Sequence, residues 1–283
     1  MMKNKLIKYT FYSFFIVLTI PVITSAMRIN KLVKVQQKIN NETTMKNTII
    51  HRSETRNHAD FGWLKVNHTF SFANYYNPER MNFGVLRVLN DDIIAGDKGF
   101  DMHFHDNMEI ITIPLSGSLK HEDDMGNKGI ISKGEIQVMS AGTGINHSEF
   151  NSDKVNDVNV LQIWVYTNKL NVEPRYQKKS LKELEKSNEL FQILSPNKNN
   201  RGVWIYQNAW FSMGNFNKKI KTNYKLNKEN NGVYIFIIEG TVNINNNQLS
   251  KRDGIGLWNI KNVEINAEMD SEILIMEIPM NKN

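Results

Sequence analysis

Short apolar runs with a period of two are the feature that most limits how this chain can fold. The clearest lie at residues 160–165, 233–238 and 273–276. Such alternation over roughly four to eight residues is typical of β-strands. Glycines such as Gly117 and Gly240 stand between the runs, where a turn needs a residue without a side chain. We therefore predict an all-β chain of sandwiches or barrels and no parallel α/β sheet.

A weak internal repeat predicts two β domains. Ser116–Leu119 followed by Lys133–Ile136 resembles Glu239–Val242 followed by Asp253–Ile255. A length of 283 residues also favours two domains over one.

A short helical connector is predicted between the two domains. Ser180 and Glu183 have the spacing of a capping box, which starts many helices. The expected division is a metal-binding N-terminal domain, a connector and a metal-free C-terminal domain, at residues 47–170, 171–186 and 187–283.

Residues 1–26 have the three parts of a secretory signal. Lys3, Lys5 and Lys8 precede a short apolar stretch, and small residues end the segment at Ala26. A cleaved signal predicts an exported protein, and an uncleaved one predicts a membrane anchor. The alternative is that translation starts at Met45, after the polar linker of residues 27–46, which predicts a cytoplasmic protein.

Charge and cysteine content exclude several classes of function. The whole formal charge of +6 is carried by residues 1–44, and the rest of the chain has no net charge. A basic face for nucleic acid is therefore not expected. The chain has 0 cysteines, so disulfides, thiolate metal sites and cysteine nucleophiles are excluded.

Two short pairs of side chains are candidates for metal ligands. His103 and His105 stand two residues apart, and so do His147 and Glu149. Residues i and i+2 of a strand point to the same face, so each pair can reach one ion. Three histidines and one carboxylate with free positions suit a redox-active first-row metal.

The remaining histidines are expected to be structural or exposed. We predict that His51 and His58 lie at the surface, that His68 is a structural histidine, and that His121 lies in a polar hairpin or loop. Glu109, four residues after His105, either turns to the ligand face or forms a salt bridge or a hydrogen bond to a ligand.

The surrounding pattern resembles the cupin fold and, within it, the pirin family. The likeness runs from about residue 49 to the end, strongly as far as Trp164 and more loosely after it. Phe104 and Asp106-Asn107 depart from the residues usual in the family. The matching motifs are Gly99–His105, Met108–Ile110, His121–Asp123, Met125–Asn127, Ser140–Ile145, His147–Asn151, His68–Tyr76 and Leu86–Asp92.

This resemblance implies two β-barrels with one divalent metal in the first barrel. The ligands implied are His103, His105, His147 and Glu149, and Glu149 has a second role as general base. We favour Fe(II), with Mn(II), Ni(II), Cu(II) and Zn(II) as alternatives. Phe104 and Asp106-Asn107 flank the ligands. Because they differ from the residues usual in the family, the resemblance does not fix access to the metal or the substrate preference.

The implied activity is that of a quercetin 2,3-dioxygenase, which opens a flavonol ring with O2 and releases carbon monoxide. The expected partners are a small phenolic substrate and O2, and the expected state is a monomer. A second hypothesis is a metal- or redox-sensing binding protein without catalysis. A third gives the metal a purely structural role in the barrel.

Overall fold

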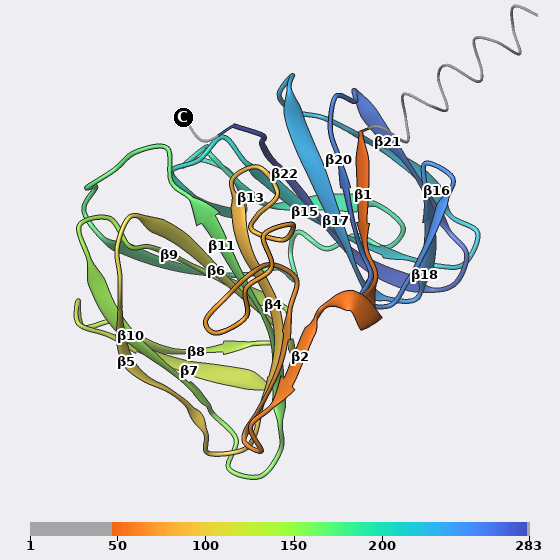
Figure 1. Cartoon of the computed structure of the whole chain (residues 1–283). Helices are drawn as coiled ribbons and strands as arrows, with labels where there is room; N and C mark the ends of the chain where they lie inside the picture. Colours follow the sequence, from red (N-terminus) through yellow and green to blue (C-terminus); the bar gives the residue numbers. More distant parts are fainter. Residues whose placement is uncertain (1–46, 282–283) are drawn as a thin grey trace, which may run out of the picture. The chain divides into compact units, whose positions relative to one another are not determined.

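The computed structural model describes residues 47–281, and residues 49–281 belong to one compact unit (Figure 1). The expected signal or anchor at 1–26, the linker at 27–46 and the alternative start at Met45 lie outside the described residues. Among the described residues, none forms a helix long and apolar enough to cross a membrane.

The regular secondary structure of the described residues is almost entirely β-strand, which confirms the predicted all-β class. The first barrel combines a seven-stranded sheet with a four-stranded sheet. The order in its large sheet is β12 (Arg175–Ser180), β9 (Glu135–Ser140), β6 (Met108–Ser116), β11 (Val158–Tyr166), β4 (Leu86–Ile94), β3 (Leu64–His68) and β2 (Asn57–Asp60). The order in its small sheet is β5 (Gly99–His105), β10 (Ile145–Asn151), β7 (Ser118–Asp123) and β8 (Lys128–Ser132).

The second barrel repeats this arrangement of seven and four strands. The order in its large sheet is β1 (Thr48–His51), β20 (Gly254–Leu257), β17 (Asn231–Glu239), β22 (Ser271–Pro279), β15 (Trp210–Phe216), β13 (Leu190–Ser195) and β14 (Val203–Trp204). The order in its small sheet is β16 (Lys221–Lys225), β21 (Asn262–Ala267), β18 (Thr241–Ile244) and β19 (Asn247–Ser250). A 3-10 helix, η1 (Ser53–Thr55), follows β1.

The edge strands β1 and β12 of the two large sheets lie at different places in the sequence. β1 precedes the first barrel in sequence but pairs beside β20 in the second (Figure 1). β12 follows the first barrel's other strands and pairs along β9, from Arg175 opposite Ser140 to Ser180 opposite Glu135.

The repeated glycines stand at equivalent points of the two barrels. Gly117 joins β6 to β7 and Gly240 joins β17 to β18, so each marks the passage from a large sheet to a small one. Their φ angles are +68° and +88°, a region that favours glycine. At Gly240 a Cβ atom would also lie 2.3 Å from the carbonyl oxygen of Asp270.

The two large sheets share one apolar core between their outer faces. Ile111 and Ile113 of β6 belong to the same buried cluster as Phe211 and Phe236 of the second barrel. Because side chains alternate along a strand, Thr112 points the other way, into the first barrel. The strand period therefore separates interface residues from barrel-interior residues.

The predicted helical connector is wrong. The segment before Ser180 is the strand β12, and after it only one turn forms, in which the N–H of Glu185 donates to the carbonyl of Leu181 at 2.9 Å. The Ser180 hydroxyl accepts from the N–H of Lys182. Leu184 is the last apolar residue of this segment. Because no longer apolar face follows that could pack against the core, the single turn does not extend into a helix.

Candidate metal centre

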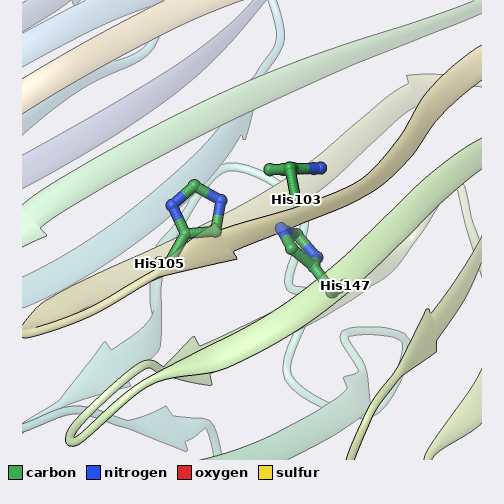
Figure 2. A group of neighbouring side chains, drawn as sticks. All are labelled: His103, His105 and His147. Atoms are coloured by element: carbon green, nitrogen blue, oxygen red, sulfur yellow. The ribbon is translucent and has the colours of Figure 1, made fainter.

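Three predicted histidines meet inside the first barrel (Figure 2). His103 and His105 come from β5 and His147 from the neighbouring strand β10, where His147 is paired with His103. One ring nitrogen from each lies within 4.8 Å of the others. Phe104, between the two β5 histidines, is 59% exposed and points away, as a period of two requires.

A β-bulge in β5 shapes the wall beside the histidines. His147 is paired with His103, whereas Glu149 is paired with Phe100, so β5 has one extra residue in this stretch. Such bulges change the direction of side chains near functional sites. The bulged stretch from Gly99 to His103 lines the cavity beside the cluster.

Hydrogen bonding leaves metal-binding nitrogens free on these side chains. The Nδ1 of His103 lies 2.7 Å from the carbonyl oxygen of Asp101, which only accepts, so Nδ1 carries the proton and Nε2 keeps its lone pair. His147 is 1% exposed, and neither of its ring nitrogens has a hydrogen-bond partner among the described residues. Unpartnered nitrogens in a buried site fit a divalent metal better than an apolar core.

Two of the three histidines, His105 and His147, lie in surroundings that favour the neutral ring. Burial, and then the neighbouring His103, lower the pKa of His105 to about 4. Burial lowers the pKa of His147 to about 2, with further contributions from His103, His105 and His121. Neutral imidazole is the form that binds metals.

Glu149 lies beside His147 and is held by the opposite sheet. The Thr112 hydroxyl donates to its Oε1 at 3.2 Å, and the Gln162 amide donates to its Oε2 at 2.5 Å. Burial raises the pKa of Glu149 to about 7, although both hydrogen bonds act to lower it. Glu149, His147 and His121 form a second group of possible metal ligands. One carboxylate oxygen of Glu149 and one ring nitrogen of each histidine lie within 4.8 Å of one another.

A row of polar side chains crosses the large sheet of the first barrel and meets Glu149. Neighbouring members are directly opposite one another on adjacent strands, so they share the inner face. The row consists of Gln137, Thr112, Gln162, Asn90 and His68. The sequence analysis missed this row, whose signal is a single polar residue inside an apolar run, as at Thr112 and Gln162.

His121 is not the hairpin or loop residue that the sequence predicted. It lies on β7 with a fully buried side chain, opposite Glu149 of β10. Its Nε2 lies 3.1 Å from Asp123 Oδ2, and its ring stacks on Tyr176 at 4.7 Å. The charged neighbours misled the prediction because Lys120 and Glu122 alternate to the outer face of β7, whereas Asp123 is buried on the same face as His121.

The other candidate residues lie away from the cluster. Glu109 is buried on the face of β6 toward the second barrel, where Ser140 donates to it at 2.6 Å and Arg175 is close. Burial raises its pKa to about 7. Even spacing from His105 is no guide here, because Asn107 lies in a turn with a φ of +44°.

The prediction of surface positions is correct for His58 and wrong for His51. His58 is exposed. His51 is 4% exposed and lies 2.9 Å from the Tyr234 hydroxyl, because β1 adds to the second barrel. His68 is buried beside Asn57, as expected of a structural histidine.

A cavity of about 500 Å³ opens onto the histidine cluster. Its walls include the aromatic side chains of Trp63, Phe72, Phe100 and Trp164, and Trp164 lies 4.8 Å from His105 and 5.1 Å from Phe72 between ring centres. Its polar lining residues include Asn90, Asp92, Glu149 and Gln162. A planar ring held between such walls would lie against the metal-binding nitrogens.

Comparison with known proteins agrees with this geometry. Residues 51–165 match the family model described as Pirin, and residues 192–278 match the model described as Quercetinase C-terminal cupin domain. A quercetin 2,3-dioxygenase of Escherichia coli K12 is 36% identical over 230 residues, covering 81% of this chain and 98% of the relative. A pirin-like protein of Caulobacter vibrioides is 36% identical over 220 residues, covering 77% and 94%.

A solved structure extends the likeness to three dimensions. The bacterial pirin YhhW from Escherichia coli in complex with nickel(II) superimposes with a TM-score of 0.77 at 36% identity, covering 82% of this chain and 99% of that protein. Sequence and fold agree over both barrels, and the chain belongs to the pirin family of two-barrel cupins.

Proposed function

We propose that this protein is a metal-dependent dioxygenase that opens the ring of a flavonol-like phenolic with O2 and releases carbon monoxide. The observation that carries the proposal is the cluster of His103, His105 and His147 at the end of an aromatic cavity. The name of the Escherichia coli relative supports the same reaction class.

The proposed ligands are His103, His105, His147 and Glu149. The first three already converge, and Glu149 is the neighbour of His147 on the same face of β10. When bound there, a divalent metal supplies a Lewis acid for the phenolic oxygen and a redox-active centre for O2. We favour Fe(II), and the nickel(II) complex of YhhW makes nickel the first alternative.

The proposed catalytic residue is Glu149. A carboxyl group with a pKa near 7 can take the proton of a phenolic hydroxyl and return it later. Thr112 and Gln162 hold both carboxylate oxygens from the opposite sheet, which fixes the direction in which the group faces the cavity. The aromatic walls hold the planar substrate and exclude water from the reacting atoms.

The test is quercetin consumption and carbon monoxide release under O2, with protein reconstituted with Fe(II), Mn(II), Ni(II) or Cu(II). The matched variant is Glu149→Gln, which keeps the size of the side chain but cannot accept a proton. We expect about one carbon monoxide per quercetin for the wild type and at least about a hundredfold lower turnover for the variant, in line with the loss of a general base.

Metal content is measured on the same samples. Metal-loaded wild-type protein without carbon monoxide release for any of the four metals would contradict the proposal. It would favour the metal- or redox-sensing binding protein instead.

A further inference from the structure

A second cavity of about 480 Å³ adjoins the one at the histidine cluster. It lies between β2, β3 and the loop after β3, and it is lined among others by Ala59, Val66, His68 and Tyr76. Neither His103, His105 nor Glu149 lines it. The two cavities have three lining residues in common, Phe72, Phe100 and Asp92.

The shared residues form an aromatic passage. Phe72 packs edge-on against Trp164 of the first cavity and, at 5.3 Å, against His68 of the second. Phe100 packs at 5.6 Å against Trp63. Aromatic edges and faces on both sides of a junction suit a ligand with ring systems in both cavities.

Asp92 is the polar group at this junction. Its side chain is 4% exposed, and its Oδ1 has no hydrogen-bond partner among the described residues. The Asp92 carboxyl group accepts a hydrogen bond from the backbone N–H of Asn67. Two residues earlier on the same strand face, Asn90 Oδ1 is also buried without a partner and lines the first cavity.

Unsatisfied buried polar atoms require an explanation, because each one lowers the stability of the folded state. Burial, the neighbouring Asp91 and the nearby Glu149 raise the pKa of Asp92 to about 8. The raised pKa favours the protonated acid, and in that form the group donates one hydrogen bond.

We infer that the second cavity is a subsite for a pendant aromatic ring, and that Asp92 donates a hydrogen bond to an oxygen of the ligand where the two cavities meet. The ligand class is a planar phenolic with two linked ring systems, the chelating one at the histidine cluster. This inference rests on the proposed function, because it places the phenolic in the first cavity.

The test compares two ligands that share the same chelating group. 3-Hydroxyflavone carries a pendant phenyl ring, and 3-hydroxychromone lacks it. Both are titrated anaerobically into the full-length nickel-loaded protein, and affinity is measured by calorimetry. We expect 3-hydroxyflavone to bind at least about tenfold more tightly, equivalent to about 1.4 kcal/mol.

The second cavity is then filled by Ala59→Phe. We expect this variant to reduce the preference for 3-hydroxyflavone below about threefold and to leave the affinity for 3-hydroxychromone unchanged, since ring burial is the source of the preference. Leu170→Phe is the control, because it adds bulk at a position that is 66% exposed and lines neither cavity.

Two variants test Asp92 itself. Asp92→Asn keeps a donor of the same shape and should bind 3-hydroxyflavone within about threefold of wild type. Asp92→Leu removes the donor and should weaken binding about tenfold, the usual effect of losing one hydrogen bond. Wild-type affinity in the leucine variant would overturn the role of Asp92.

The outcomes separate this inference from the proposed function. Equal affinities for the two ligands, unchanged by Ala59→Phe, would overturn the subsite even if quercetin is consumed. Binding of neither ligand to the metal-loaded protein would overturn both.

Discussion

The two barrels have the same strand order, but their inward-facing side chains differ in polarity. Across the large sheet of the first barrel the inner row is polar, and its central members are Thr112 and Gln162. At the equivalent strands of the second barrel, β17 and β22, the paired residues are Ile235 and Ile275. The small sheets differ in the same way, because β10 carries His147 and Glu149 where β21 carries buried apolar residues.

This comparison shows that a few inward-facing residues decide whether such a barrel contains a candidate metal site with a cavity or a closely packed apolar core. The second barrel fills most of its interior with isoleucine, valine and leucine, which pack densely, and its buried Glu277 accepts hydrogen bonds from Tyr224 and Asn231. The first barrel keeps a cavity and a hydrogen-bonded row instead. Function here depends on inner-face residues, and the strand order alone does not predict it.

Removing a cluster histidine should leave the first barrel, like the second, without a metal site. His147→Ala is expected to lower bound metal at least about tenfold and to abolish turnover, since it deletes a nitrogen shared by both candidate ligand groups. Metal analysis after dialysis and carbon monoxide release provide the measurements. The control is His121→Ala, which we expect to keep both metal and turnover; a metal-free control protein would overturn our ligand assignment.

Copying the second barrel's row into the first should leave a barrel without catalysis. The double variant Thr112→Ile with Gln162→Ile leaves Glu149 buried without its two donors, so its pKa should rise further above 7. We expect the metal to remain and quercetin turnover at neutral pH to fall about a hundredfold, in line with loss of a proton acceptor. An unchanged rate over pH 6–9 would show that the row does not support Glu149.

The reverse exchange should cost stability. Ile275→Gln removes a fully buried apolar group and places an amide among mainly apolar side chains, with Ser212 directly opposite on β15. We expect the free energy of unfolding in urea to fall by about 4 kcal/mol, from lost burial and an unsatisfied amide. A loss below about 1 kcal/mol would mean that the second barrel also tolerates a polar row.

Acid should weaken the contact between the barrels through His51. Burial, and then Arg80, lower its pKa from 6.5 to about 4, so between these pH values the unfolded chain binds a proton that the folded protein does not. The stabilisation is complete above pH 6.5 and is lost as the pH falls to 4, by about 3 kcal/mol.

This prediction has a matched pair of variants. His51→Gln should flatten the decline in unfolding free energy between pH 6.5 and 4, whereas His58→Gln, at an exposed position, should not change it. Equal slopes for wild type and His51→Gln would contradict the assignment.

Local patterns in the sequence predicted the fold class and the histidine pairs. A period of two is a property of the single strand, so the shared face of His103 and His105 needs no knowledge of neighbouring strands. The family resemblance then placed these pairs in the first of two barrels. The turn glycines Gly117 and Gly240 were also readable, because their conformation is local.

Features that depend on strand register could not be predicted. The polar row exists only because Thr112, Gln162 and Asn90 face one another on different strands. His121 was misplaced because burial on β7 depends on the opposite sheet. The helix expected at Ser180 was wrong because the segment after β12 forms only one turn, which is too short to be stable as a helix on its own.

The position of β1 has a consequence for synthesis of the chain. Its partner β20 begins at Gly254, about two hundred residues later, so the strand must remain unpaired until almost the whole protein has left the ribosome. An unpaired strand edge is prone to aggregation. Truncated chains that end before β20 should therefore expose this edge, and the second barrel expressed from β13 onward should lack its outermost strand.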